Sequence, residues 1–224
     1  MDTSEAAGQD QGTAPGRARA ARPEAGQSPG RPAAQDGPGA PETTEYVALL
    51  RGVNVGGRRM PMAALREVLT GLGHRGVRTW LQSGNAVFTA PAGGRDLLTA
   101  ELQDALAARF GFRVDCLLLS AAELAATAAR CPFPADALDP AKLSVVFLGG
   151  PAGAHPLHAA EAAAYAPDEF RLGEREIFAY FPGGMGRSRL GALLATSPPG
   201  LLATARNWRT VRALLDLTGR PAPG

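Results

Sequence analysis

Arginine and glycine gather in two segments of the sequence where they could bind an anion. Residues 51–59 read RGVNVGGRR, and residues 183–189 read GGMGRSR. Guanidinium groups, free backbone N–H groups and helix N-termini bind phosphate and carboxylate groups. Two shorter polar segments, QSGN at 82–85 and TARNW at 204–208, are candidates to share these sites. The predicted ligand-binding residues are Arg51, Asn54, Gly56, Gly57, Ser83, Asn85, Arg187, Ser188, Arg189, Arg206, Asn207 and Trp208.

The same residues also fit purely structural roles. The first segment lacks the Gly-Lys-Ser/Thr end of a Walker A loop and the G-x-G-x-x-G spacing of a dinucleotide fingerprint. Its Asn54 and glycines equally suit left-handed backbone in a tight crossover. Gly84 and Asn85 are typical of a hairpin turn, and Trp208 could either stack a nucleobase or pack in the core. Anion binding and backbone geometry are therefore both open interpretations.

Residues that could catalyse a reaction are sparse. His155 and His158 lie three apart but have no third ligand nearby, so no metal site is predicted. Cys116 falls on a predicted strand and Cys131 lacks an obvious partner base, so neither is predicted to be a nucleophile. Neither arginine-rich segment contains the carboxylate or imidazole that general acid–base chemistry needs. Binding is therefore favoured over catalysis, and no cofactor is predicted.

Alternating strand and helix patterns predict the elements that position these residues. In chain order we expect a strand at 46–50, a helix at 61–72, strands at 77–81 and 86–89, a helix at 97–110 and a strand at 112–119. A bridging helix at 121–129 leads to a second set, with a strand at 143–148, a helix near 157–165, strands at 170–172 and 177–181, a helix at 188–194, a strand near 201–204 and a final helix at 208–217. The order β-α-β-β-α-β, present twice, is that of an α/β plait.

The predicted fold class is therefore α+β, with two tandem α/β-plait (ferredoxin-like) βαββαβ subdomains and a C-terminal helix. In a plait with strand order 4-1-3-2, the loop after the first strand and the turn between the second and third emerge at one sheet end. This predicts that 51–59 lies beside 82–85. In the second subdomain, the loop after the third strand and the end of the fourth share the opposite end, which brings 183–189 towards 204–208.

Composition bounds the class of protein. The chain has 224 residues, of which 45% are hydrophobic and 20% charged, with a formal net charge of +2. The apolar share supports a packed core, and no apolar run approaches the roughly 20 residues that span a bilayer. The Met1 end has no basic start followed by an apolar block, so no secretory signal is predicted and a cytoplasmic protein is expected.

The first part of the chain differs sharply from the rest. From residue 2 to residue 44 there is no Val, Ile, Leu, Phe, Tyr or Trp, and such a segment buries too little surface to offset the entropy of ordering it. We predict a disordered Ala-, Gly- and Pro-rich leader at 1–44, subdomains at 45–130 and 131–219, and a disordered tail at 220–224.

Four separated motifs resemble those of a widespread bacterial family. They are YVALLRGVNVGG at 46–57, QSGN at 82–85, GRSRL at 186–190 and TARNW at 204–208, in that order. Over about 45–217 the chain resembles the uncharacterised family named domain of unknown function 1697. The resemblance implies two α/β-plait subdomains in one chain, and it implies no particular activity. Arg59 and Met60 stand where relatives tend to carry lysine, and the leader is unlike the family.

The residues favour a cytosolic module that binds a phosphate-bearing ligand, either a nucleotide or single-stranded nucleic acid. One alternative is an enzyme acting on a small phosphorylated substrate, which would need a catalytic acid from outside these segments, such as Asp168 or Glu169. Another is a structural or protein-interaction module, which would use its arginines in internal ion pairs and expose a large apolar patch. The expected partner is therefore a phosphorylated small molecule or a nucleic acid and not a membrane, and the sequence predicts no oligomeric state.

Overall fold

The computed structural model describes residues 42–220, which belong to one compact unit. The first strand, β1, spans Thr43–Leu50, so regular structure starts two residues before the expected Glu45. The rest of the predicted disordered leader, residues 1–41, and residues 221–224 of the predicted tail lie outside the described residues. No helix in the described part of the chain is long and apolar enough to cross a membrane.

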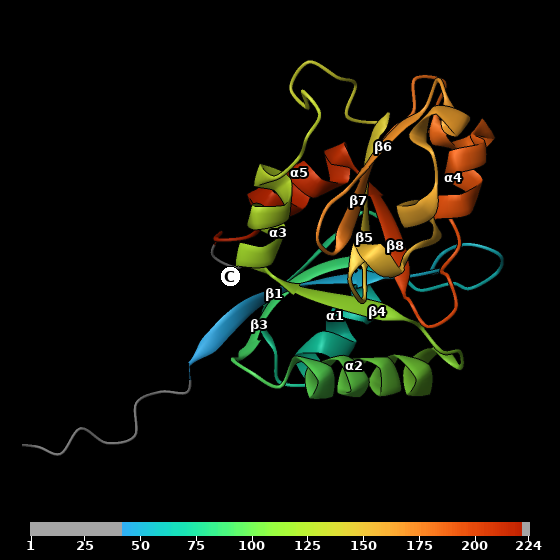
Figure 1. Ribbon diagram of the computed structural model, residues 1–224. Helices are drawn as coiled ribbons and strands as arrows, with labels where there is room; N and C mark the ends of the chain where they lie inside the picture. The colour runs from blue at the N-terminus through green and yellow to red at the C-terminus, as the bar shows by residue number, and fades with distance from the viewer. Residues whose placement is uncertain (1–41, 221–224) are drawn as a thin grey trace, which may run out of the picture. The chain divides into compact units, whose positions relative to one another are not determined.

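The first sheet has the strand order β2-β3-β1-β4, and each neighbouring pair is antiparallel. Its remaining strands are β2 (Arg75–Trp80), β3 (Asn85–Pro91) and β4 (Cys116–Ser120). Two helices, α1 (Met62–Gly71) and α2 (Arg95–Phe110), cover one face and lie below the sheet in Figure 1. Leucines of both helices pack against Tyr46, Ala48 and Leu50 of β1 to form a first core.

The second sheet has the order β6-β7-β5-β8 and is also antiparallel throughout, so the two sheets repeat one arrangement. Its strands are β5 (Leu143–Leu148), β6 (Glu169–Leu172), β7 (Glu176–Tyr180) and β8 (Ala203–Asn207). The short helix α4 (Arg189–Leu194) contributes Leu190 and Leu194 to a second core on this sheet.

The connection between β5 and β6 differs from the prediction. In place of one helix near 157–165 the chain forms three short 3₁₀ helices, Ala152–Ala154, Pro156–Ala159 and Ala162–Tyr165. Ala160 and Glu161, between the last two, have extended backbone. Between the buried Leu157 and the half-buried Tyr165 the sequence offers mainly alanine, so it lacks the apolar stripe that docks a helix. Alanine propensity alone does not sustain so short a helix, and the helix prediction was wrong here.

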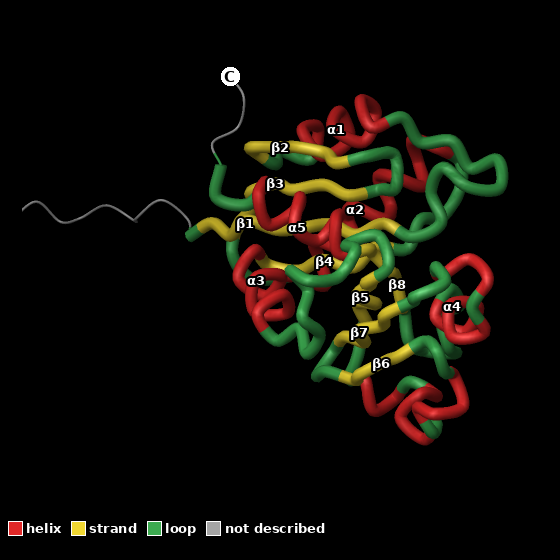
Figure 2. The backbone as a smooth tube through the Cα atoms, turned by 90° about the horizontal axis from the view of Figure 1, so that it is seen from above, coloured by secondary structure: helices red, strands yellow, loops and turns green. Residues whose placement is uncertain are grey.

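The two sheets share a third core. Val47 and Leu49 of β1 alternate with the residues that face α1 and α2, and they pack with Val145 and Phe147 of β5. The helices α3 (Ala121–Ala129) and α5 (Trp208–Leu217) add residues to the same core. Figure 2 shows α5 lying across the first sheet, with α3 at its side. Both faces of β5 and of residues 46–50 of β1 are therefore buried, which explains the apolar runs at 46–50 and 145–148.

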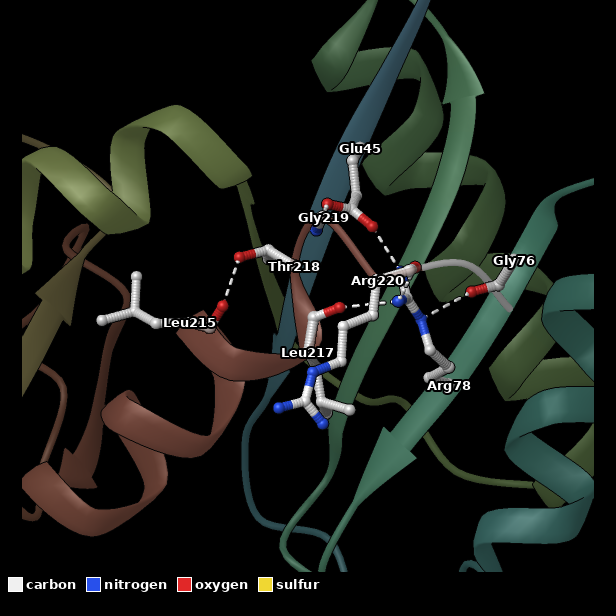
Figure 3. Close-up of polar contacts among 8 residues, drawn as sticks. All are labelled: Glu45, Gly76, Arg78, Leu215, Leu217, Thr218, Gly219 and Arg220. Atoms are coloured by element: carbon white, nitrogen blue, oxygen red, sulfur yellow. Dashed lines mark hydrogen bonds and ion pairs between the residues drawn. The ribbon is translucent and has the colours of Figure 1, made fainter. Parts of the chain in front are cut away.

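The chain that follows α5 is fastened to the first sheet (Figure 3). Arg78 of β2 is only 8% exposed and pairs with Glu45 of β1. Its guanidinium group also donates to the backbone carbonyls of Leu217 and Arg220. Glu45 in turn accepts a hydrogen bond from the backbone N–H of Gly219 at 2.7 Å. This cluster holds the end of α5 against β1 and β2.

Candidate anion-binding site

Arg206, on β8, reaches from the second sheet into the first. Its side chain is 8% exposed, and every N–H of its guanidinium group has a protein acceptor. The acceptors are Asn85 Oδ1 for Nε, Thr204 Oγ1 and the Ala205 carbonyl for Nη1, and the carbonyls of Leu50, Ser83 and Gly84 for Nη2. Arg206 therefore joins the end of β1 and the β2–β3 turn to the second sheet.

Arg206 carries a buried positive charge without an acidic partner. It takes part in none of the ion pairs found among the described residues. Burial lowers the pKa of Arg206 to about 10, and repulsion by Arg51 adds to this, yet the group stays charged at neutral pH. Cys116 opposes the shift, but burial raises the pKa of its thiol to about 12, so at neutral pH it is uncharged. Because buried charges in proteins are normally paired, a bound anion would compensate Arg206.

Arg51 is a second guanidinium group at the same place, in the loop that follows β1. Its Nη1 donates to the carbonyl of Ala203 and its Nη2 to that of Ala195, at 2.6 Å for the latter. These bonds hold Arg51 against the second sheet. They use two of its five N–H groups, and Nε and one hydrogen on each terminal nitrogen have no acceptor among the described residues. Arg51 can therefore donate to a ligand directly.

A cavity of about 430 Å³ opens beside these two arginines. Residues from both sheets line it, including Arg51, Val55, Ser83, Met185 and Arg206. Among the described residues that form its walls, none is aspartate, glutamate or histidine. Two positive charges thus face a space whose other walls are neutral, and the arrangement suits an anion and offers no side chain for general acid–base catalysis.

Asn54 and Gln82 fix the loop on the first sheet next to the β2–β3 turn. Asn54 adopts left-handed backbone, with φ 56°. Its Nδ2 donates to the carbonyls of Met60 and Gln82 at 2.9 and 2.6 Å, and its Oδ1 accepts from the N–H of Met60 at 2.8 Å. The structure therefore brings 51–59 beside 82–85, as the strand order predicts, and the side chain of Asn54 is occupied in bracing this arrangement. Gly56 and Gly57 lie exposed in the same loop with positive φ.

Gly84 permits a close approach that no other residue allows. Its φ is +74°, and a Cβ at this position would lie 2.6 Å from Val53 Cγ2 and 2.8 Å from Leu50 Cβ. The next residue, Asn85, is buried and donates to the Trp80 carbonyl and to Ser83 Oγ, at 3.0 and 2.9 Å. The turn is thus packed tightly against the end of β1, which leaves Ser83 exposed at the cavity.

The second arginine-rich segment comes towards 204–208 at Met185, which lines the cavity with Thr204 and Arg206, but its arginines do not line that cavity. Ser188 caps α4 by accepting from the N–H of Gly191 at 2.7 Å, and it also donates to Asp168. Arg189 lies over the Tyr165 ring at 5.3 Å, and Arg187 is exposed. Of 183–189, only Met185 lines the cavity. The structure therefore groups Arg206 with Arg51 and Ser83 instead of with Arg187, Ser188 and Arg189.

Asn207 and Trp208 have structural contacts. Asn207 caps α5, since its Oδ1 accepts from the N–H of Thr210 at 2.9 Å. Trp208 is 6% exposed and belongs to the core between the sheets, so its ring offers no open face for stacking. The sequence prediction missed Val55 and Met185 of the cavity. Their positions depend on how one sheet packs on the other, and no local pattern in the sequence carries that information.

A separate cavity of about 260 Å³ lies along β4, and its walls carry both acidic and basic residues, four of which form ion pairs. Arg95 pairs with Glu123 at 2.7 Å, and Arg130 pairs with Glu176 at 2.9 Å. Burial would raise the pKa of Glu123, but hydrogen bonds from Ser120 and Arg95 outweigh it and lower that pKa. No group of three or more histidine, cysteine or acidic residues in the described chain could hold a metal ion. With Asp96, Glu174 and Arg175 also in its walls, this cavity mixes acids with arginines, unlike the acid-free cavity of Arg51 and Arg206.

The fold and the site define a two-sheet α/β protein with an acid-free basic cavity between its sheets. A family model described as "Protein of unknown function (DUF1697)" matches residues 43–178, and the chain belongs to this family. A search of curated proteins gave no match. Among solved structures, the chain is similar to that of the conserved bacterial protein SP0830 from Streptococcus pneumoniae, with a TM-score of 0.65 and 24% sequence identity. That likeness covers 80% of this chain and 100% of the other, and it shows a common fold.

Proposed function

We propose that the protein is a binding module for a phosphate-bearing ligand, held at the cavity of Arg51, Ser83 and Arg206. One observation carries the proposal: two arginines without acidic partners among the described residues face a cavity with neutral walls. A phosphate group would supply the missing negative charge. It would also accept charge-assisted hydrogen bonds, which are stronger than neutral ones.

Each residue has a distinct part in this proposal. Arg51 is half-buried with three unused N–H groups, so it donates to the phosphate oxygens. Ser83 Oγ already accepts from Asn85, which leaves its hydroxyl hydrogen to donate to the ligand. Arg206 has no free N–H, and its contribution is the charge itself, acting from beneath the cavity at reduced dielectric screening. Asn54, Gly84 and Asn85 position the other groups.

The arrangement of charges favours binding over the two alternatives. An enzyme would need an acid or base at the cavity, and its described walls contain none. Of the two acids considered from the sequence, Asp168 accepts a hydrogen bond from Ser188 and Glu169 pairs with Arg171, and neither lines the cavity. A purely structural module would use most arginines in internal ion pairs. In the described chain only Arg78, Arg95, Arg130 and Arg171 are used in this way.

We further propose that the two sheets are two copies of an α/β plait of the ferredoxin-like type. The shared strand order supports this, because β2-β3-β1-β4 and β6-β7-β5-β8 both read 2-3-1-4 within their halves. The second copy would be a divergent one, since 3₁₀ turns replace its first helix. The first copy would contribute Arg51 to the cavity, from the loop after its first strand. The second copy would contribute Arg206, from its last strand.

Calorimetric titration with pyrophosphate and with ATP tests the binding proposal. We expect Arg51→Gln to weaken both ligands by about 10-fold or more, the loss typical of one charge-assisted hydrogen bond. Arg75→Gln is the matched control, because Arg75 is exposed at the other end of β2 and has no ion pair with a described residue. Equal affinity of wild type, Arg51→Gln and Arg75→Gln would refute the proposal. Release of phosphate from ATP during the titration would favour the enzyme alternative instead.

A further inference from the structure

A second cavity, of about 500 Å³, adjoins the first and has the same chemical character. The two arginines in its walls are Arg59 and Arg66, and none of its described wall residues is acidic. The same loop and turn line both cavities: Gln82 faces this one, and its neighbour Ser83 faces the other. The β2–β3 turn therefore stands between two basic cavities whose walls meet at adjacent residues.

The arginines that line these two cavities form no ion pair with a described acid. The ion pairs of the described chain use Arg78, Arg95, Arg130 and Arg171, none of which lines either of the two cavities. Arg59 is exposed, and within the described chain Arg66 donates only to Thr79 Oγ1, at 2.7 Å. With Arg51 and Arg206 they form a track of positive charge that runs around the sheet end.

Exposed apolar side chains flank this track. Val55 is 60% exposed, Leu81 56% and Trp80 37%, and they lie in the loop after β1 and at the β2–β3 turn. Leu81 also has a φ of 54°, a left-handed conformation that costs a branched residue free energy. Trp80 pairs with Asn85 across the strands, so the two side chains lie on the same face of the first sheet. Arg206 contacts Asn85 on this face. Aromatic rings beside a basic groove are typical platforms for unstacked bases.

We propose that the ligand is a single-stranded nucleic acid, whose backbone passes from the cavity of Arg59 and Arg66, over the β2–β3 turn, to the cavity of Arg51 and Arg206. This inference rests on the proposed function, which it extends from one phosphate to a chain of them. A mononucleotide fills only one of the cavities, whereas consecutive phosphodiesters reach both. Trp80 stacks a base exposed between them, a contact that requires a strand without a paired partner.

Fluorescence anisotropy with a labelled oligothymidylate, and competition by thymidine monophosphate, tests this inference. We expect the oligonucleotide to bind at least about 10-fold more tightly than the monophosphate, with a steep salt dependence. Arg59→Gln should weaken the oligonucleotide by about 10-fold, leave the monophosphate unchanged and reduce the salt slope by about 0.7. Arg51→Gln should weaken both ligands. Arg75→Gln should change neither.

The tryptophan gives an independent readout. Trp80→Ala should weaken the oligonucleotide by about 5- to 100-fold, whereas Trp80→Phe should retain most of the affinity, because phenylalanine still stacks. Leu97→Ala is the control, since Leu97 is 78% exposed on α2, away from both cavities. Trp208 is buried, so quenching of tryptophan fluorescence by the oligonucleotide should disappear in both Trp80 variants.

The failure of this inference differs from the failure of the proposed function. If Arg51→Gln weakens the monophosphate while Arg59→Gln and Trp80→Ala leave the oligonucleotide unaffected, the nucleic-acid track is wrong and the phosphate site stands. Tighter binding of a duplex than of the single strand would also overturn the track. Absence of binding by every probe, pyrophosphate included, would overturn both.

Discussion

Arg206 Nε donates a hydrogen bond to Asn85 Oδ1, although the two residues lie 121 positions apart in the chain. The bond connects the last strand of the second sheet to the first residue of β3. Nη2 of Arg206 extends the connection to the carbonyl of Leu50, at the end of β1. The side chain that supplies the buried charge of the candidate site therefore also joins the two sheets, so binding and stability are linked at this residue.

Replacing Arg206 by lysine should destabilise the protein although the charge is kept. Lysine offers three N–H groups in place of five, and it leaves buried acceptors such as Asn85 Oδ1 and the Leu50 carbonyl unsatisfied. We expect the free energy of unfolding to fall by about 2–4 kcal/mol in urea denaturation. Arg75→Lys, on an exposed strand end, should change it by less than about 0.5 kcal/mol. Similar values for the two variants would contradict the assignment of Arg206 as an inter-sheet link.

Alanine at position 84 should be far more costly than alanine at another glycine with positive φ. Gly84→Ala adds a methyl group within 3 Å of Val53 and Leu50 to the strain of φ +74°. Gly93 has a φ of +84° but nothing within 4 Å of the added Cβ, so Gly93→Ala isolates the backbone strain. We expect losses of about 3 kcal/mol and about 1 kcal/mol of unfolding free energy, respectively. Equal losses in thermal or urea denaturation would show that the turn can move away from β1.

Most of the secondary structure could be predicted from local pattern. The predicted ranges 121–129 and 208–217 match α3 and α5, because Ser120 and Asn207 are strong capping residues placed directly before them. Ser120 and Glu123 also form a capping box. β5 matches 143–148, since a compact run of six residues, five of them apolar, suits a fully buried strand. The strand order then brings Asn54 to Gln82 as expected.

The composition of the site depended on packing that a local pattern does not encode. Arg206 and Arg189 both follow glycine- or alanine-rich sequence, yet Arg206 is buried against β1 while Arg189 lies over Tyr165. Arg51 is anchored by carbonyls of the second sheet, at Ala195 and Ala203. Backbone carbonyls are present at every residue, so no residue type marks them in advance as partners. Contacts between the sheets therefore had to come from the structure.

Removing the arginine that fastens the end of α5 should release the chain after it. Arg78→Met leaves Glu45 without its partner and the carbonyls of Leu217 and Arg220 without their donor. We expect a loss of about 2 kcal/mol in unfolding free energy. We also expect faster hydrogen exchange at the Gly219 amide, which donates its hydrogen bond to Glu45. Arg171→Met is the control, because the Arg171–Glu169 pair is about half exposed and should contribute less than about 1 kcal/mol. Unchanged exchange at Gly219 in Arg78→Met would argue against this anchor.

Two buried histidines should make the protein less stable in mild acid. His155 is 2% exposed and His74 7%, and Nε2 of each has no hydrogen-bond partner among the described residues. Burial lowers the pKa of both, although Glu101 opposes the shift at His74. The unfolded chain therefore takes up these protons first, and stability falls as the pH drops below about 6.5, by up to about 1.4 kcal/mol per pH unit for each histidine.

Replacing His155 by asparagine separates this effect from general acid instability. Asparagine Oδ1 can take the place of Nδ1 as acceptor for the N–H of Leu157, and it does not titrate. We expect His155→Asn to show a flatter decline of unfolding free energy between neutral pH and pH 5 than wild type, whatever its absolute stability. His158→Asn, at an exposed position, should leave the wild-type slope. If His155→Asn keeps the wild-type slope, protonation of His155 does not lower the free energy of unfolding, and this prediction is wrong.

The third core has a consequence for the nascent chain. Val47, Leu49 and Val87 leave the ribosome well before Phe147, and earlier still than Val211 and Leu214 of α5. Until translation has delivered those later residues, one face of the first sheet is an uncovered apolar surface. The N-terminal half can therefore acquire its hydrogen-bonded strands during synthesis but not its final packing. Folding is completed only when the last helix emerges, and in the interval that surface is a natural target for chaperones.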